Sequence, residues 1–209
     1  MIVVTTSGSS DVIFEFLDKY HYLRYYKHSL AVVVNGGKPD FLKRLRDESG
    51  EDFILCNGYG QYDFGTVLYA LDFLDADSYT FIQDSCLPVS CAGMDKLAYC
   101  AEGEATAWAS FEGMFDSASQ EKWCEDIAGS VEFEWGIFGP IFSATRLDLE
   151  RIVELRDIVV DNKDKQQAME RVWPILFKKY GIKVSFLEKF SDIQSGKMKL
   201  FENKFLHRK

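Results

Sequence analysis

The sequence is poor in the residues that mark several specialised classes of protein. Only 4 of its 209 residues are proline, which excludes a proline-rich linker, and no two of the 5 cysteines are separated by two residues. A disulfide framework and a zinc knuckle are therefore not indicated, and a reducing compartment fits the cysteine pattern. No apolar run approaches the roughly 20 residues of a membrane span, and no basic-then-apolar leader opens the chain. These absences predict a protein of the cytoplasm with no membrane span.

Positive charge is also scarce. The chain has 24 Lys and Arg against 33 Asp and Glu, a net charge of -9, which argues against a nucleic-acid partner because such surfaces need clustered basic residues. With 47% hydrophobic residues the chain can fold as one compact domain over residues 1–209 without disulfides or a structural metal. To bind an anionic ligand, a protein this acidic would need a bound cation, a helix amino terminus or a few basic side chains that point at the ligand.

Four short apolar runs alternate with helical patterns over residues 1–90. The expected strands are 2–7, 30–34, 53–56 and 79–83, and the expected helices between them are 12–23, 40–46 and 63–74. Beyond residue 90 the expected elements are antiparallel strands at 108–111 and 131–142, helices at 147–159 and 165–180, and a last strand at 182–187. The predicted fold is an α/β, Rossmann-like mixed sheet with a parallel core of about four strands, additional antiparallel strands and flanking helices.

Polar residues stand where each expected parallel strand ends. They are Thr5, Thr6 and Ser7 after the first strand, Asn35 after the second, Asn57 and Gly58 after the third, and Asp84 after the fourth. Ligands of open α/β sheets bind beyond the carboxyl ends of the strands, so these residues are expected to surround one ligand. Asp84 would deliver a carboxylate to a site where Mg²⁺ or Mn²⁺ needs only one or two carboxylates besides water and phosphate oxygens. A turn or capping aspartate is the alternative.

Two other segments resemble known ligand-binding motifs, but their position or spacing does not fit those motifs. Asp75-Ala76-Asp77 is a literal Asp-x-Asp, but it precedes the fourth strand and is expected in a solvated turn at the opposite edge of the sheet. The glycine-rich segment 57–65 fails as a dinucleotide fingerprint because Asp63 occupies the third glycine position. An ordinary glycine turn with Asp63 as a helix N-cap is the alternative for this segment.

Residues 3–7 and 32–37, the Asn-x-Gly and Asp-x-Gly of residues 57–65, and residues 79–88 together resemble GT-A-fold nucleotide-sugar glycosyltransferases. The likeness covers about the first 90 residues. More narrowly, the opening and residues 83–86 resemble the amino-terminal domain of chlorella-virus capsid-glycan glycosyltransferases. The narrower resemblance implies a viral protein in the host cytoplasm, with further domains in a larger polypeptide.

The resemblance implies a metal-dependent transfer of a sugar from a nucleotide-sugar donor, a UDP-sugar, to a glycan or glycoprotein acceptor, with Mn²⁺ or Mg²⁺ as cofactor. It places Thr5, Thr6, Ser7 and Asn35 near the base and ribose, Asp63 near the nucleoside, and Asp84 in the position of the family's Asp-x-Asp. Residues 1–90 would form the nucleotide-binding half and residues 91–209 the half for donor sugar and acceptor. Gln83 and Ser85 flank Asp84 where the family has a second acid. The metal site would therefore be weaker, or a ligand would come from elsewhere, for which His207 is a candidate.

Glu170 and Glu134 are the candidates for a catalytic base. An inverting transfer needs a carboxylate that takes the proton of the acceptor hydroxyl, whereas a retaining one need not place one there. Glu170, in the segment 169–173, resembles the acidic residue that related enzymes carry on a helix before the last strand, with a solvated helix face as the alternative. Glu134 adjoins an aromatic cluster of Trp135, Phe138 and Phe142, which either stacks on sugars or belongs to the core.

Three other functions stay open at this point. A dinucleotide-dependent oxidoreductase or a methyltransferase would use the glycine turn after residue 57 without a metal. A non-catalytic sugar- or nucleotide-binding module would keep the fold and lose the dependence on a divalent ion. Cys86 as a nucleophile is the third, although no histidine lies near it in sequence. Metal-dependent turnover by the isolated chain would exclude all three.

Overall fold

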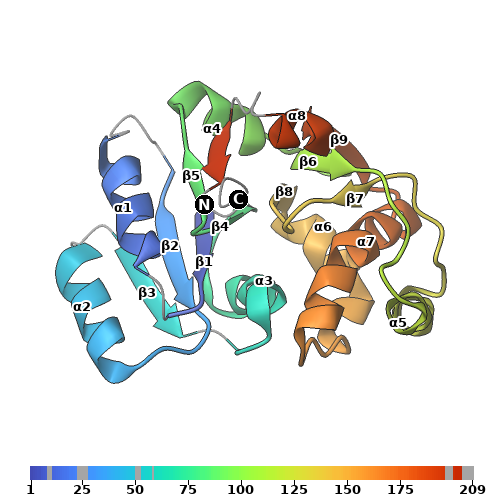
Figure 1. Cartoon of the computed structure of the whole chain (residues 1–209), viewed down its shortest axis with the longest axis horizontal. Coiled ribbons are helices and arrows are strands. Elements are labelled where there is room, and N and C mark those ends of the chain that lie inside the picture. The colour runs from blue at the N-terminus through green and yellow to red at the C-terminus, as the bar shows by residue number, and fades with distance from the viewer. Residues whose placement is uncertain (9–10, 23–27, 50–52, 58, 196–199, 204–209) are drawn as a thin grey trace.

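The computed structural model describes residues 1–8, 11–22, 28–49, 53–57, 59–195 and 200–203. Within these residues the centre of the fold is an eight-stranded mixed sheet (Figure 1), in the order β3-β2-β1-β4-β8-β6-β7 with β9 also paired to β6. The strands are β1 (Ile2–Thr6), β2 (Leu30–Val34), β3 (Phe53–Asn57), β4 (Ser78–Gln83), β6 (Glu104–Phe111), β7 (Gly136–Ile137), β8 (Phe142–Thr145) and β9 (Lys183–Lys189). A separate two-stranded sheet joins β5 (Cys86–Pro88) to β10 (Phe201–Asn203).

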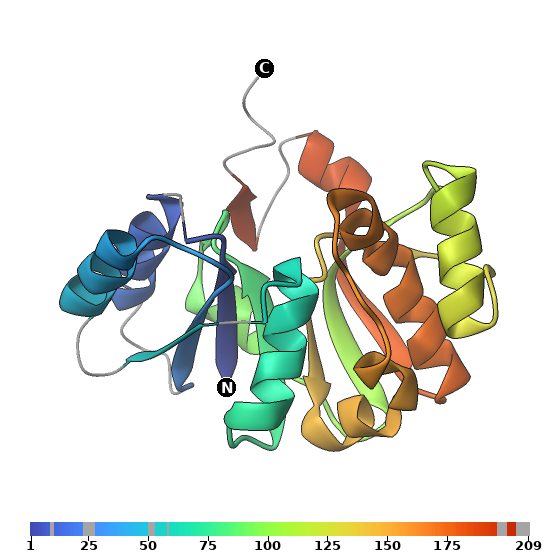
Figure 2. The same cartoon turned by 90° about the horizontal axis from the view of Figure 1, so that it is seen from below.

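Helices cover both faces of the large sheet. One hydrophobic core holds residues of α1 (Val12–Tyr22), α2 (Pro39–Ser49), α4 (Cys91–Leu97) and α8 (Phe190–Gln194). The other holds residues of α3 (Tyr62–Phe73), α5 (Ala118–Ala128), α6 (Arg146–Arg151) and α7 (Lys163–Lys179). Figure 2 shows α3 and α7 side by side on this second face. No helix in the described part of the chain combines the length and apolarity that crossing a bilayer requires.

The strand order reverses between β1 and β4. β1 pairs in parallel with β2, where Val3 lies beside Ala31, and with β4, where Val3 lies beside Phe81. β2 pairs in parallel with β3, so the chain winds in one direction from β1 to β3 and then crosses to β4. The predicted parallel core is therefore confirmed. A reversal of this kind opens a crevice at the carboxyl ends of the two central strands.

The second half of the sheet is mainly antiparallel, as predicted, but β9 pairs in parallel with β6, and several elements differ from those expected. β8 pairs antiparallel with β4 and with β6, and β7 pairs antiparallel with β6. The single strand predicted at 131–142 is wrong, because a turn at Gly139-Pro140 separates β7 from β8 and Gly139 has a φ of 62° that favours glycine. The single helix predicted at 147–159 is also wrong. α6 ends at Arg151, where Ile152 leaves the helical conformation, and a 3₁₀ turn follows at Val153–Arg156.

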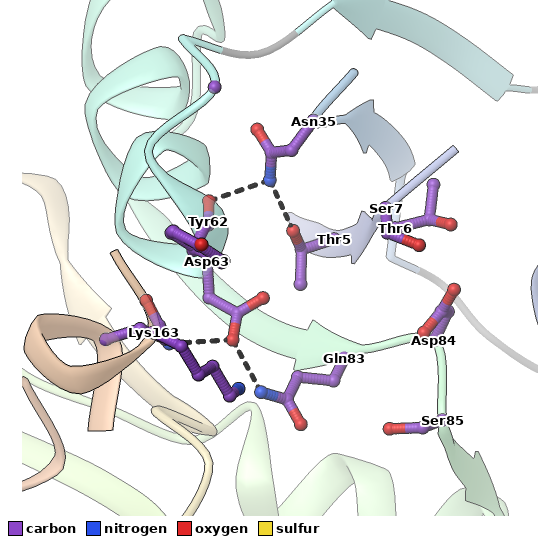
Figure 3. Close-up of a pocket in the computed structure, with 12 residues that line it drawn as sticks. Thr5, Thr6, Ser7, Asn35, Tyr62, Asp63, Gln83, Asp84, Ser85 and Lys163 are labelled. Carbon is purple, nitrogen blue, oxygen red and sulfur yellow. Dashed lines mark hydrogen bonds between the residues drawn. The ribbon is translucent and has the colours of Figure 1, made fainter. Parts of the chain in front are cut away.

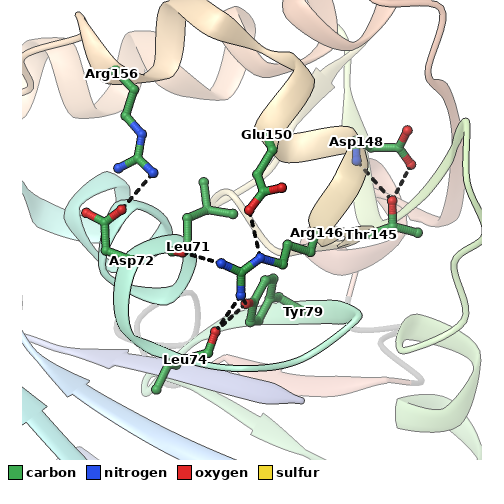
Figure 4. Close-up of polar contacts among 9 residues, drawn as sticks. All are labelled: Leu71, Asp72, Leu74, Tyr79, Thr145, Arg146, Asp148, Glu150 and Arg156. Carbon is green, nitrogen blue, oxygen red and sulfur yellow. Dashed lines mark hydrogen bonds and ion pairs between the residues drawn. The ribbon is translucent and has the colours of Figure 1, made fainter.

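An arginine from α6 binds the carboxyl end of α3 at the edge of the sheet away from this crevice (Figure 4). The Arg146 guanidinium donates to the Leu71 carbonyl at 2.9 Å and to the Leu74 carbonyl at 3.0 Å. These carbonyls belong to the last turn of α3 and the residue after it, which have no further helical N–H to bind. A second ion pair joins Arg156 to Asp72 of α3 at 2.7 Å. The position of α3 is therefore fixed from both α6 and the 3₁₀ turn.

Candidate functional site

A polar cavity of about 340 Å³ lies at the carboxyl ends of β1, β2 and β4, beside the reversal in strand order. We call it the strand-end cavity. Its lining residues come from three strand ends and from the first turns of two helices (Figure 3) and are Thr5, Thr6, Ser7, Asn35, Gly60, Tyr62, Asp63, Gln83, Asp84, Ser85, Lys163 and Gln166. The volume and the polar lining suit a nucleotide-sized ligand with several hydrogen-bonding groups.

The structure brings most of the sequence-predicted residues to this one cavity. Those that line it are Thr5, Thr6, Ser7, Asn35, Asp63 and Asp84. Asn57 ends β3, but its side chain lies outside the described residues, as do Gly58 and His207. The Asp75-Ala76-Asp77 segment lies in the exposed turn before β4, at the opposite end of the strand from Asp84.

Asn35 connects β2 to β1 and to α3. Its Nδ2 lies 2.8 Å from Thr5 Oγ1, 2.8 Å from the Tyr62 carbonyl and 3.0 Å from Thr66 Oγ1, and Thr66 Oγ1 in turn lies 2.8 Å from Thr5 Oγ1. The Tyr62 carbonyl can only accept, so the amide must present its nitrogen there. Asn35 Oδ1 is thereby left as a buried acceptor with no hydrogen-bond partner among the described residues. A bound ligand with an N–H or O–H group would complete it.

Asp63 lies in the first turn of α3 and faces β4 and α7. Its Oδ2 accepts from Gln83 Nε2 at 2.5 Å and from Gln166 Nε2 at 2.8 Å. Burial raises the pKa of this carboxyl, against the opposing effect of the Gln83 hydrogen bond and the Lys163 charge. The alternative of an N-cap is wrong, because the N-cap position of α3 is Gln61 and Asp63 is inside the helix.

Asp84 follows β4 and carries an unsatisfied carboxylate oxygen. Its backbone N–H donates to the Thr5 carbonyl at 3.0 Å, which fixes the residue against β1. Its Oδ2 is buried and has no hydrogen-bond partner in the described residues. The pKa of Asp84 is raised to about 6, mainly by burial and also by the neighbouring Asp63, against the hydrogen bonds from Thr6 and the Ser85 backbone. A buried acceptor of this kind lacks the proton or cation that would offset its desolvation.

The chemistry of this position fits one ligand of a hard divalent cation. The described residues contain no group of three or more His, Cys, Asp or Glu side chains that could hold a metal by themselves. Mg²⁺ and Mn²⁺ are commonly bound by one or two carboxylates, with water and substrate phosphate oxygens as the other ligands. Asp84 Oδ2 meets that requirement, and no second carboxylate is needed.

Helix α7 contributes two residues to the lining of the cavity that were not predicted from the sequence. Lys163 and Gln166 line the cavity, and Glu170 follows Gln166 at a spacing of four, which places it on the same helix face. Glu170 Oε1 accepts from the Gly139 N–H at 3.0 Å. The pKa of Glu170 is raised to about 7, mainly by burial and also by Asp63. The Gly139 hydrogen bond and the charges of Arg171 and Lys163 oppose this rise. Glu170 is not among the residues that line the cavity, but it lies one helical turn beyond Gln166 and in electrostatic range of Asp63.

Glu134 lies elsewhere. It is exposed and lines a second cavity of about 440 Å³, between α7 and β9, together with Trp135, Pro174 and Lys178. Trp135 also lines a cavity of about 220 Å³ at the carboxyl ends of β6 and β9. Phe142 is fully buried against Trp173 and belongs to the core.

The sequence does contain a pattern that could have identified Gln166 as a buried polar residue. Gln166, Met169 and Trp173 recur at the spacing of one helix face, and all three are buried. A glutamine on the buried face of an amphipathic helix requires polar partners inside the fold, which here are supplied by Asp63. Lys163 carried no such signal, because it sits in a polar run that is typical of a solvated helix start.

No protein-family model matches the sequence, and no curated protein matches it either. Solved structures do. Glucosyl-3-phosphoglycerate synthase from Mycobacterium tuberculosis, in complex with phosphoglyceric acid, has a TM-score of 0.55 at 12% identity, over 90% of this chain and 68% of that one. Galactosyltransferase LgtC, in complex with donor and acceptor sugar analogs, has a TM-score of 0.50 at 12% identity, over 88% of this chain and 72% of that one.

A third similar structure is a nucleotide-using enzyme of another kind. CMP:2-keto-3-deoxy-manno-octonic acid synthetase, complexed with CTP, has a TM-score of 0.53 at 10% identity, over 90% of this chain and 88% of that one. At these identities the similarity establishes the fold alone, and the chain has a GT-A-like nucleotide-binding fold. The fold implied by the sequence resemblance is confirmed, whereas the narrower likeness to chlorella-virus enzymes stays a prediction.

Proposed function

We propose that this protein is a glycosyltransferase that moves a sugar from a nucleoside diphosphate sugar to a hydroxyl group of a glycan or glycoprotein. The observation that carries the proposal is the strand-end cavity, where a hydrogen-bonded pocket lies beside an unpartnered carboxylate oxygen of Asp84. Two of the similar structures, LgtC and the glucosyl-3-phosphoglycerate synthase, are sugar transferases, and this supports the choice of reaction.

The nucleoside is proposed to bind between Thr5, Asn35 and Asp63. Asn35 Oδ1 is an acceptor without a partner and would take an N–H of the base or a hydroxyl of the ribose. Its Nδ2 is already committed to Thr5 and Tyr62, so the orientation of the amide is set before the ligand arrives. A uridine diphosphate sugar is the proposed donor, as the sequence resemblance implies.

Asp84 is proposed to hold a divalent cation, Mn²⁺ or Mg²⁺, through Oδ2. When bound, the ion would supply positive charge for the diphosphate that leaves the sugar. Gln83 and Ser85 line the cavity on either side of Asp84, and neither is ionisable at neutral pH. Asp84 is therefore the proposed single protein ligand, which predicts a weak metal site in the absence of nucleotide.

Glu170 is the proposed base. The bond between the anomeric carbon and the distal phosphate oxygen breaks with its electron pair going to the phosphate, and the acceptor oxygen bonds to the anomeric carbon. The proton of the acceptor hydroxyl passes to the Glu170 carboxylate. A pKa of about 7 suits a general base near neutral pH, and the Gly139 N–H orients one carboxylate oxygen.

Calorimetric titration of UDP, CDP, GDP and ADP, with and without Mn²⁺, tests the nucleotide and the metal together. We expect UDP to bind in the presence of Mn²⁺ and Asp84→Asn to weaken that binding by about tenfold or more. Asp77→Asn is the matched control, since it removes an exposed carboxylate at the other end of the same strand and should bind UDP like the wild type. Metal-independent binding in all three proteins would contradict the role of Asp84.

Product analysis separates the reaction from its rivals. A glycosyltransferase incubated with Mn²⁺, a UDP-sugar panel and a glycan mixture releases UDP. Release of pyrophosphate from CTP would instead assign the cavity to nucleotidyl transfer, the class of the octonic acid synthetase. Nucleotide binding without any turnover would identify a binding module, and NAD binding without metal would identify a dinucleotide site.

A further inference from the structure

Lys163 brings an unneutralised positive charge into the strand-end cavity. It is the first residue of α7, its side chain is exposed, and it lines the cavity together with the carboxyl groups of Asp63 and Asp84. Its charge lowers the pKa of Asp63 and of Glu170, so the ammonium lies within electrostatic range of both. Across the described part of the chain, the Lys163 ammonium forms no hydrogen bond or salt bridge.

The next lysine of α7 shows the contrast. Lys165 forms an ion pair with Asp161 at 3.0 Å, and its ammonium lies 5.8 Å from the centre of the Trp123 ring. Its charge is therefore engaged beside α5, and Lys165 is not among the residues that line the cavity. The two residues have the same chemistry, nearly the same position in the helix and different surroundings, which makes Lys165 a matched control.

A second group at the same helix end lacks a partner. Gln166 is only 3% exposed and lines the cavity one turn after Lys163. Its Nε2 donates to Asp63, whereas its Oε1 is buried and has no hydrogen-bond partner among the described residues. Leaving a buried acceptor unpaired is costly, so the missing donor is expected from a ligand. A sugar hydroxyl is such a donor. The amino terminus of α7, where the Asn162 side chain accepts from the Lys165 N–H, carries partial positive charge that favours an anion beside it.

We propose that Lys163 and the amino terminus of α7 bind the distal phosphate of the donor, the phosphate that carries the sugar, with the sugar next to Gln166. Figure 3 shows Lys163 and Asp84 on opposite sides of Gln83. The diphosphate would therefore lie across Gln83, between the Lys163 ammonium and the cation proposed at Asp84. The inference rests on the proposed function and adds a residue that contacts the leaving group. A phosphate contact from Lys163 would also explain how a protein with a net charge of -9 binds an anionic diphosphate through a metal held by only one carboxylate.

Comparison of UDP with UMP isolates the distal phosphate, since UMP lacks it. Calorimetry is run on wild type, Lys163→Met, Lys163→Arg and Lys165→Met, with and without Mn²⁺, and CDP with CMP, GDP with GMP and ADP with AMP serve as parallel pairs. We expect Lys163→Met to weaken UDP binding about tenfold or more and to leave UMP binding within about twofold of wild type. Lys163→Arg should keep most of the affinity, and Lys165→Met should match the wild type. Thermal melting of each variant confirms that it is folded.

Two outcomes overturn the inference and can be told apart. If Lys163→Met weakens UDP and UMP equally, or weakens UDP no more than Lys165→Met does, Lys163 does not contact the distal phosphate and the proposed function stands. If the wild type binds none of the nucleoside diphosphates, the proposed function and this inference fail together.

Discussion

The two halves of the sheet contribute different kinds of residue to the same cavity. The parallel half, β1 to β4, contributes side chains that are already hydrogen-bonded to one another, such as Thr5 with Asn35 and Thr66. The half beyond β4 contributes α7, whose cavity-facing residues include an unpaired lysine, Lys163, and an unpaired amide oxygen on Gln166. Both sets leave buried acceptors unpaired, Asn35 Oδ1 and Asp84 Oδ2 in the first and Gln166 Oε1 in the second, but only the second adds a positive charge to the lining of the cavity.

The two sets also differ in exposure. β1 and β2 are buried along their whole length, because helices pack on both of their faces. Lys163, at the start of α7, is exposed. We infer that the parallel half sets where the nucleotide lies and that the second half determines which group is transferred and how.

Replacement of Glu170 should have the largest effect, because the second half is proposed to carry the chemistry. Glu170→Gln keeps the size of the side chain and an oxygen that can accept from the Gly139 N–H, but it cannot take a proton. We expect turnover of the UDP-sugar to fall by about 10²- to 10⁴-fold, with UDP affinity nearly unchanged. Initial rates of UDP release and calorimetry measure the two quantities.

Glu134→Gln is the control for this variant. Glu134 is exposed and lines a separate cavity, so its substitution should leave turnover close to the wild-type value. If Glu134→Gln lowers turnover and Glu170→Gln does not, the base has been assigned to the wrong glutamate. In that case the cavity between α7 and β9, rather than the strand-end cavity, would lie at the reaction centre.

A pair of glycines tests the rigidity of the parallel half. Gly8 and Gly103 have similar positive φ values of 66° and 77°, but a Cβ on Gly8 would lie 2.7 Å from the Gly36 carbonyl oxygen, whereas one on Gly103 would meet nothing within 4 Å. We expect Gly8→Ala to lower the free energy of unfolding by about 3 kcal/mol and Gly103→Ala by about 1 kcal/mol. Urea denaturation measures both, and equal losses would show that the loops after β1 and β2 can separate easily.

The smallest expected effect is a pH dependence of stability caused by Glu170. Its pKa is raised from 4.5 to about 7 in the folded protein, so the folded state binds the extra proton between these values. The free energy of unfolding should therefore fall as pH rises through this window, and Glu170→Gln should remove that part of the decline. Relative to wild type, the variant should gain about 2 kcal/mol between about pH 5 and about pH 8, a value reduced for partial exposure.

Urea denaturation of both proteins at the two pH values gives this difference directly. Asp63 and Asp84 also have raised pKa values and are present in both proteins, so the comparison reports Glu170 together with its coupling to Asp63. A constant difference between wild type and variant across the window would mean that Glu170 keeps an ordinary pKa and is well solvated. The proposal of Glu170 as a base near neutral pH would then lose its support.

Much of the parallel half could be predicted from the sequence, because its information is local. Each of β1, β2 and β4 is a short apolar run that ends in polar residues, and parallel strands bring their carboxyl ends to one edge. For that reason Thr5, Asn35 and Asp84 could be assigned to one ligand without knowledge of the structure, and the structure places them in one cavity.

The second half could not be predicted in the same way, because its contacts are distant in sequence. Gln166 meets Asp63 across 103 positions, and nothing near either residue indicates the pairing. The turn at Gly139-Pro140 was missed inside an aromatic run that resembles a strand. β5 and β10 are only three residues long each, too short for any periodicity to show.

Helix α3 is held at both ends, and this has a consequence for movement. Asp63 in its first turn binds Gln83 and Gln166, and the carbonyls at its last turn bind Arg146 of α6. Neither end is free to absorb a displacement, so α3 behaves as a strut between the cavity and the far edge of the sheet. A shift of α6 would be transmitted along the helix axis to Asp63. Because Gln166 Nε2 donates to Asp63 at 2.8 Å, the first turn of α7 is tied to the same strut, and α3 and α7 would move together.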